Sequence, residues 1–249
     1  MSMDLSVIIP QYNELSNLKK GLLHEVFKSL ATLGLGYEVI IIDDGSTDGS
    51  LKFVREEYGD KDNIKIIEAS HGGKPHAILK GLENANGQNI LFSDMDQSTP
   101  MSEITKLLKH IGEYEAVIGS RGTKRNSASI LRKISGWMFS TFRKTLILKS
   151  IEDTQCGFKL FRGYVLKEIF PLLSVLRTKS VDGWSVSAFD VELLYLIERR
   201  GWKIKEVKVD WKDEDVSDTK SRKFFRESLD MLKQVLRIVS RELMGKYSS

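Results

Sequence analysis

Two short acidic strings follow isoleucine-rich stretches of this sequence and could do chemistry. Asp94 and Asp96 follow Ile-Leu-Phe at 90–92 after one intervening serine. Two carboxylates at positions i and i+2 past a strand end can turn toward one cation, and their oxygens suit Mg²⁺ or Mn²⁺ carrying phosphate. The alternative is an acidic turn that helps to start the helix predicted after Ser98-Thr-Pro100.

The second acidic string is Asp43-Asp-Gly-Ser-Thr-Asp48, which also follows an Ile-rich run. Carboxylates there can accept hydrogen bonds from a nucleobase or ribose, and the alternative is an Asx turn with Asp48 as a helix N-cap. Gly72-Gly-Lys74 precedes a predicted helix, where backbone N–H groups can bind anions. It matches neither a Walker A loop nor a dinucleotide fingerprint, so the sequence gives little support for a dinucleotide-dependent oxidoreductase.

These strings lie between elements that the hydropathy pattern predicts. Short runs rich in Ile and Val predict strands at 5–9, 38–42, 64–67, 89–92, 115–119 and 203–209. Longer amphipathic stretches predict helices at 15–33, 49–58, 74–85 and 188–200. Strand followed by helix, repeated, indicates an α/β fold with a mostly parallel central sheet flanked by helices. The polar loops after the first four strands should then meet at the carboxyl edge of the sheet, where ligands bind in such folds.

The composition is that of a soluble globular protein. The chain has 249 residues, of which 41% are hydrophobic and 29% charged, so we expect one large domain, with or without an appendage. The single cysteine, Cys156, excludes an intramolecular disulfide framework and a Cys-rich zinc site. Neither a secretory signal nor an apolar run of membrane-spanning length is present in the sequence, so we expect a cytoplasmic protein without a transmembrane segment.

Positive charge is concentrated in two segments of the second half. Residues 121–149 contain eight Lys or Arg and no acid, with apolar residues at helical spacing, and residues 224–244 predict a cationic helix. Basic amphipathic helices bind anionic membrane faces, so we expect peripheral attachment to the cytoplasmic face of a membrane. Such segments can also track nucleic acid, but the clustered acids would repel it, and we expect no nucleic-acid partner.

Taken in order, the motifs resemble a known family. Residues 6–14, 42–48, 72–74 and 94–96 are similar in order and spacing to the nucleotide-sugar domain of family 2 glycosyltransferases with the GT-A fold, which is Rossmann-like. Residues 153–161, 189–194 and 207–211 resemble the branch that includes dolichyl-phosphate β-glucosyltransferases, and dolichol-phosphate mannosyltransferases match these strings less closely.

The resemblance covers about residues 5–221. It implies a GT-A domain at 1–221, followed by a basic amphipathic C-terminal helix at 222–249. Within the domain, residues 1–120 would bind the nucleotide sugar and residues 121–221 the acceptor.

The resemblance also implies roles for particular residues. Asp94 and Asp96 would hold Mg²⁺ or Mn²⁺, with Asp96 as the more direct ligand; the glutamine that helps to hold the metal in the mannosyltransferases is replaced by Ser98, with Gln97 beside it. The nucleotide sugar would contact Pro10, Tyr12, Asn13, Glu14, Asp43, Asp44, Lys74, Asp94, Met95 and Asp96. The acceptor would contact Arg121, Arg132, Asp153, Gln155 and Lys220. The catalytic candidates are Asp96, Arg121, Asp190 and Glu192.

The implied reaction is inverting transfer of a hexose, with glucose from UDP-glucose as the first choice, to a polyprenyl or dolichyl phosphate, giving a β-linked product. The acceptor phosphate is already ionised near pH 7, so its attack on the sugar C1 needs little help from a base. The alternatives are a GDP-mannose-dependent transfer to the same lipid, and transfer to a glycan hydroxyl with Asp190 or Glu192 as base. Because Asp190 and Glu192 are two residues apart on a helix, they do not face the same way, and one of them could be structural.

Overall fold

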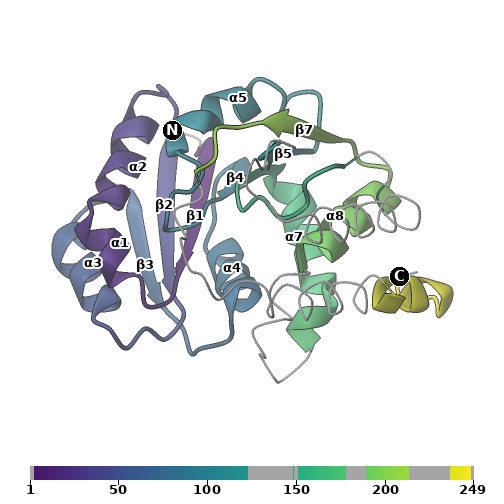
Figure 1. Ribbon diagram of the computed structural model, residues 1–249, viewed down its shortest axis with the longest axis horizontal. Helices are drawn as coiled ribbons and strands as arrows, with labels where there is room; N and C mark the ends of the chain where they lie inside the picture. Colours follow the sequence, from purple (N-terminus) through teal and green to yellow (C-terminus); the bar gives the residue numbers. More distant parts are fainter. Residues whose placement is uncertain (1–2, 123–147, 149–150, 178–188, 213–235, 248–249) are drawn as a thin grey trace, which may run out of the picture.

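A computed structural model describes residues 3–122, 148, 151–177, 189–212 and 236–247. This part of the chain contains a sheet in the order β3-β2-β1-β4-β6-β5-β7 (Figure 1). The strands are β1 (Leu5–Gln11), β2 (Tyr37–Asp43), β3 (Ile64–Glu68), β4 (Asn89–Phe92), β5 (Ala116–Ser120), β6 (Lys159–Arg162) and β7 (Ile204–Lys208). All six predicted strands are present, and β6 was not predicted.

The sheet is mostly parallel, as predicted. Strand β1 pairs in parallel with β2 and β4, β2 with β3, and β5 with β7. Strand β6 lies between β4 and β5 and is antiparallel to both. The residues of β1, β2, β4 and β5 are almost all buried, because helices cover both faces of the sheet.

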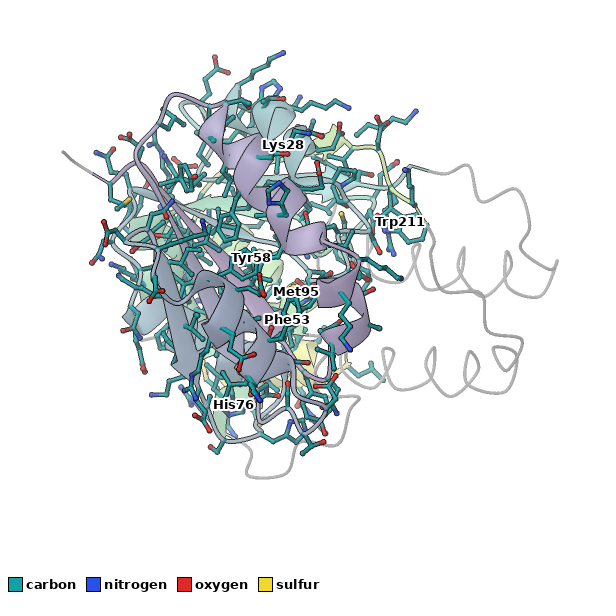
Figure 2. The ribbon with its side chains drawn as sticks, turned by 90° about the vertical axis from the view of Figure 1, so that its left-hand side faces the viewer. Lys28, Phe53, Tyr58, His76, Met95 and Trp211 are labelled. Carbon is teal, nitrogen blue, oxygen red and sulfur yellow. The ribbon has the colours of Figure 1, made fainter. Side chains whose placement is uncertain are left out.

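The helices form a layer on each face of the sheet. They are α1 (Leu15–Lys19), α2 (Leu22–Ala31), α3 (Ser50–Tyr58), α4 (Lys74–Glu83), α5 (Ile104–Leu108), α7 (Gly163–Ile169) and α8 (Phe189–Arg199), with 3₁₀ turns at Met101–Glu103, Phe170–Leu172 and Ser174–Arg177. Helices α1, α2, α3 and α5 share one buried apolar cluster, and α4, α7 and α8 share the other. Figure 2 looks onto the first layer, marked by Lys28 of α2 and by Phe53 and Tyr58 of α3.

The helix predictions differ from the structure at one predicted helix and at one helix that was not predicted. The helix expected at 15–33 is two helices, because Gly21 between them has φ of 79°, a left-handed conformation that ends one helix before the next begins. Helix α7 was not predicted. Most of the two basic segments falls outside the described residues, and of the tail predicted as a helix, residues 236–243 are described and helical. None of the helices described has the length and apolar character needed to cross a bilayer.

The parallel order brings four loops together. Strands β1, β2, β3 and β4 run in the same direction, so the polar loops that follow them leave the sheet at the same edge. The predicted convergence of these loops at the carboxyl edge is therefore confirmed.

Candidate functional site

The loops after β1 and β2 are joined by hydrogen bonds. The backbone N–H of Asn13 donates to Ser46 Oγ at 2.9 Å, and Asn13 Oδ1 accepts from the Thr47 N–H at 2.8 Å. The φ of Asn13 is 56°, a left-handed value that asparagine tolerates better than most residues. The Glu14 N–H donates to Ser50 Oγ at 2.9 Å. Asn13 thus fixes the first motif against the second.

Asp43 and Asp44 are buried, and both oxygens of each carboxylate accept hydrogen bonds within the chain. Asp43 accepts from Gln11 Nε2 and from the Ser46 N–H, each at 2.9 Å. Asp44 accepts from the backbone N–H groups at 72–73, each at 2.8 Å. Asp44 therefore ties the loop after β2 to the glycines that precede α4, and Asp43 closes a turn within its own loop. The alternative, with Asp48 as a helix N-cap, needs correction, because the N-cap of α3 is Gly49.

Lys74, the first residue of α4, forms an ion pair with Asp94, which follows β4. Burial alone would raise the pKa of Asp94, but the charges of Lys74, Lys159 and Arg121 outweigh it and lower that pKa. Burial alone would lower the pKa of Lys74, but Asp94 and Asp190 raise it. Both groups are therefore held in their charged forms at neutral pH.

A cavity of about 190 Å³ lies where these loops meet. Its lining residues are Pro10, Gln11, Tyr12, Glu14, Asp44, Lys74, Asp94, Met95 and Asp96. The structure brings together every predicted nucleotide-sugar residue except Asn13 and Asp43, and it adds Gln11. Tyr12 is 46% exposed and stacks on His71 with ring centroids 4.4 Å apart. The cavity thus offers an aromatic surface beside acidic and basic groups.

The acids of the cavity are close enough to affect one another. Burial raises the pKa of Glu14, and the charges of Asp96 and Asp94 raise it further. Asp96 Oδ1 accepts from the Ser98 N–H at 2.9 Å. A cation among these acids would lower their mutual repulsion.

The oxygen atoms near Asp94 and Asp96 fit a hard divalent cation. Gln97 Nε2 donates to the Asp94 carbonyl at 2.7 Å, and Gln97 Oε1 is buried without a hydrogen-bond partner among the described residues. Within that same part of the chain, no group of three or more His, Cys, Asp or Glu has the arrangement of an all-protein metal site. This is compatible with Mg²⁺, which is usually held by one or two carboxylates and by substrate phosphates.

On the acceptor side, Arg121 and Asp153 bind each other. Arg121 follows β5, and its Nε and Nη2 donate to the two Asp153 carboxylate oxygens at 2.7 and 2.8 Å. The guanidinium lies 5.4 Å from the ring centroid of Trp211, which is labelled at the right of the coloured ribbon in Figure 2. Burial opposes ionisation of Asp153, but Arg121 outweighs it and lowers the pKa of Asp153 to about 2. The Gln155 N–H also donates to Asp153, at 3.1 Å, so three of the predicted acceptor residues form one cluster.

Asp190 and Glu192 of α8 make unrelated contacts. Asp190 Oδ1 accepts from Lys159 Nζ at 2.6 Å, and its charge raises the pKa values of Lys74 and Arg121. Asp190 therefore lies within electrostatic reach of both the cavity and the acceptor cluster.

Glu192 is instead a packing residue at the other side of α8. Its Oε2 accepts from the Ser174 N–H and Oγ, and its Oε1 accepts from the Tyr247 hydroxyl at 2.5 Å. The structure does not bring Glu192 to the cavity, so of the two acids only Asp190 remains near the site.

Some site residues lie outside the prediction or outside the described chain. Arg132 and Lys220 fall outside the described residues. Gly157 was not predicted as a site residue. If it carried a side chain, the Cβ would lie 1.9 Å from Asp94 Oδ2, so only glycine fits there without displacing the carboxylate. Lys159 was also missed, and it is 1% exposed with its charge directed at Asp190. A lysine within an apolar strand is the signal that could have identified Lys159; nothing local in the sequence marks Gly157 as a neighbour of Asp94.

Comparisons with known proteins give a consistent set of relatives. The family model described as Glycosyl transferase family 2 matches residues 6–170. The chain is 36% identical to a dolichyl-phosphate beta-glucosyltransferase of Dictyostelium discoideum, over 97% of this chain and 75% of that protein. It is 31% identical to the protein of the same name from Saccharomyces cerevisiae, over 98% of this chain and 76% of that protein.

Solved structures with the same fold are more distant in sequence. Glucosyl-3-phosphoglycerate synthase from Mycobacterium tuberculosis in complex with UDP has a TM-score of 0.65 and 15% identity, over 96% of this chain and 80% of that one. Mannosyltransferase PcManGT from Pyrobaculum calidifontis in complex with GDP-Man and Mn²⁺ has a TM-score of 0.64 and 19% identity, over 97% of this chain and 65% of that one. At these identities the likeness concerns the fold.

Proposed function

This chain belongs to glycosyl transferase family 2, and from that premise we propose that it transfers glucose from UDP-glucose to dolichyl phosphate or another polyprenyl phosphate. The observation that carries the proposal is the 36% identity, over 97% of the chain, to a dolichyl-phosphate beta-glucosyltransferase. The geometry agrees with it, because an acidic cavity and an arginine cluster lie near each other at the carboxyl edge of the sheet.

The cavity is the proposed nucleotide-sugar site. Tyr12 offers a ring face to the base, and Lys74 offers a positive charge to the diphosphate. Asp94 and Asp96, which both line the cavity, would hold Mg²⁺ or Mn²⁺. When bound, such an ion neutralises charge on the departing diphosphate. A mannosyltransferase of the same fold binds Mn²⁺ together with GDP-Man.

Arg121 is the proposed contact for the acceptor phosphate. A guanidinium has five N–H donors, and Asp153 takes one from Nε and one from Nη2. Asp153 and Trp211 restrict the side chain, so its other N–H groups can meet a phosphate in a fixed position.

The reaction then needs no base on the protein. An ionised oxygen of the acceptor phosphate forms a bond to C1 of glucose while the bond from C1 to the diphosphate oxygen breaks. The electron pair leaves with UDP, and C1 changes from the α to the β configuration. The chain's own residues orient the two substrates and stabilise their charges, and Asp190 acts as the counter-ion of Lys159.

The lipid acceptor places the enzyme at a membrane face, which we propose is the cytoplasmic one. Leu243 and Met244 near the end of the chain are 84% and 57% exposed, and Lys246 follows them. Exposed apolar side chains next to basic ones are typical of segments that bind anionic lipid surfaces.

The test measures release of the nucleoside diphosphate by the purified protein with Mg²⁺ or Mn²⁺. The donors are UDP-glucose, GDP-mannose and UDP-N-acetylglucosamine, each with and without a polyprenyl phosphate. We expect lipid-dependent turnover with UDP-glucose. The Asp96→Asn variant should lose at least about 100-fold in turnover, and Asp60→Asn, at an exposed turn before β3, is the matched control.

Other outcomes lead to specific corrections. Lipid-dependent turnover with GDP-mannose would mean that the transferred sugar is mannose and that the proposed acceptor is correct. Donor binding without lipid-dependent turnover would indicate that the acceptor group is a hydroxyl and not a lipid phosphate. Asp190 would then be the candidate base to examine. Equal turnover of wild type and Asp96→Asn would remove Asp96 from the mechanism.

A further inference from the structure

Only one of the two polar atoms in the side-chain amide of Gln11 has a hydrogen-bond partner among the described residues. Gln11 is the last residue of β1 and is 2% exposed. Its Nε2 donates to Asp43 Oδ1 at 2.9 Å. Its Oε1 is buried and has no hydrogen-bond partner among the described residues. A buried acceptor left without a donor is unfavourable, so most such atoms in native proteins are paired.

The orientation of this amide is set by Asp43. The carboxylate of Asp43 only accepts hydrogen bonds at neutral pH, so it selects the NH₂ group of Gln11. A flipped amide would place an oxygen against a carboxylate oxygen and lose the bond. The oxygen of Gln11 is therefore the atom left over, and the orientation follows from chemistry.

Gln11 lines the same cavity as Tyr12, Asp44 and Lys74. The oxygens of Asp43 and Asp44, which the sequence predicted as contacts of the nucleoside, already accept hydrogen bonds within the chain. Gln11 therefore lines the cavity and carries a buried, uncharged acceptor, Oε1, to which no group of the described chain donates.

We propose that Gln11 Oε1 accepts a hydrogen bond from the nucleoside of the sugar donor and thereby helps to select it. This inference rests on the proposed function. A diphosphate has no hydrogen-bond donor at neutral pH, so the partner is the N3–H of a uracil or a ribose hydroxyl. A site built around such a bond rejects a ligand that lacks the donor, because the buried oxygen is then left unpaired.

The experiment measures the dissociation constants of UDP, N3-methyl-UDP, 2′-deoxy-UDP and 3′-deoxy-UDP by titration calorimetry with Mg²⁺. The wild type should bind one of the three altered nucleotides about 10- to 100-fold more weakly than UDP. The nucleotide affected identifies the partner as the base or as one hydroxyl. In Gln11→Met, which keeps the length of the side chain and removes the acceptor, that difference should fall to about threefold or less. Gln88→Met, at an exposed position before β4, is the matched control and should keep the wild-type difference.

Several results would overturn the inference. If the dissociation constants of the wild type for all four nucleotides agree within about threefold, no hydrogen-bond donor of the nucleoside meets a buried acceptor. This result would overturn the inference whatever the affinities of Gln11→Met are. If Gln11→Met keeps the wild-type difference, another acceptor makes the bond. In both cases UDP binds and the proposed function stands, whereas failure of the wild type to bind UDP at all would remove the proposed donor and this inference together.

Discussion

Gly157 packs against Asp94, one of the two acids of the cavity. A Cβ at this position would lie 1.9 Å from Asp94 Oδ2, so Gly157→Ala must displace the carboxylate that pairs with Lys74. We expect at least about 10-fold weaker binding of UDP with Mg²⁺. Titration calorimetry measures this, and thermal unfolding checks that the variant is folded.

A matched control for Gly157→Ala is available. Gly112 has open space around its position and no left-handed backbone, so Gly112→Ala should leave UDP binding unchanged. Wild-type affinity in Gly157→Ala would mean that Asp94 can move without cost to the site.

The ion pair between Arg121 and Asp153 predicts a pH-dependent contribution to stability. The pKa of Asp153 is lowered to about 2 from its ordinary 3.8. A lowered pKa stabilises the folded state above the ordinary value, and this contribution is lost as the pH falls through the folded pKa. Asp153→Asn should therefore lower the free energy of unfolding by about 2 kcal/mol at pH 7.

Denaturant unfolding of both proteins between pH 7 and pH 3 measures this contribution. The difference between wild type and Asp153→Asn should stay constant down to about pH 4 and then shrink by about 1 kcal/mol per pH unit. A difference that is independent of pH over the whole range would show that Asp153 stabilises the fold by packing and not by charge.

At the level of single residues, the sequence predicted which side chains meet but not what each one does. Glu14, Lys74, Asp94 and Asp96 line one cavity as expected, because each follows or precedes a predicted element at the same sheet edge. Asp43 was expected to face a ligand, yet its oxygens hold Gln11 and Ser46. A hydrogen-bond partner 32 residues away cannot be read from local spacing.

At the level of elements, the parallel strands were predictable and the antiparallel one was not. Buried parallel strands are continuous Ile and Val runs, and β1 and β2 show this pattern. Strand β6 has the sequence Lys-Leu-Phe-Arg, and its buried lysine pairs with Asp190 of α8 and donates to the Cys156 carbonyl. The GT-A fold expected from the motifs is confirmed by the solved structures that share it.

One of the contacts between α8 and the end of the chain is a hydrogen bond to the buried carboxylate of Glu192. Burial raises the pKa of Tyr247, and the charge of Glu192 raises it further, so the phenol stays protonated and donates to Glu192. Tyr247→Phe would leave Glu192 Oε1 without this donor and should lower the free energy of unfolding by about 1 to 3 kcal/mol. Denaturant unfolding measures the loss.

Two further measurements show whether the effect of Tyr247→Phe comes from the lost hydrogen bond to Glu192. Tyr164 is 56% exposed, so Tyr164→Phe should leave the stability unchanged. UDP binding should be unchanged in Tyr247→Phe, because Glu192 and Tyr247 are absent from the cavity lining. Weaker UDP binding at unchanged stability would contradict the assignment of Glu192 as a packing residue.

At the level of the whole molecule, the described end of the chain has two different sides. Ile238 and Tyr247 are buried against the apolar cluster of α7 and α8, whereas Leu236, Leu243 and Met244 are exposed. The three exposed residues are spaced at i, i+7 and i+8, which places Leu236 and Leu243 on one helical face and Met244 at its end. The same segment therefore docks on the domain through Ile238 and Tyr247 and presents apolar side chains to solvent.

This arrangement predicts that the end of the chain contributes to binding at a membrane surface. The combined variant Leu243→Ser, Met244→Ser should bind vesicles of phosphatidylcholine and phosphatidylserine several-fold more weakly than wild type, because each buried CH₂ group contributes about 0.8 kcal/mol to partition into lipid. Cosedimentation at low and moderate salt measures the binding. Leu35→Ser, in the loop before β2 and 38% exposed, is the matched control and should bind as wild type does. Equal binding of wild type and the combined variant would assign the attachment to other parts of the chain, and absence of wild-type binding at low salt would refute peripheral attachment itself.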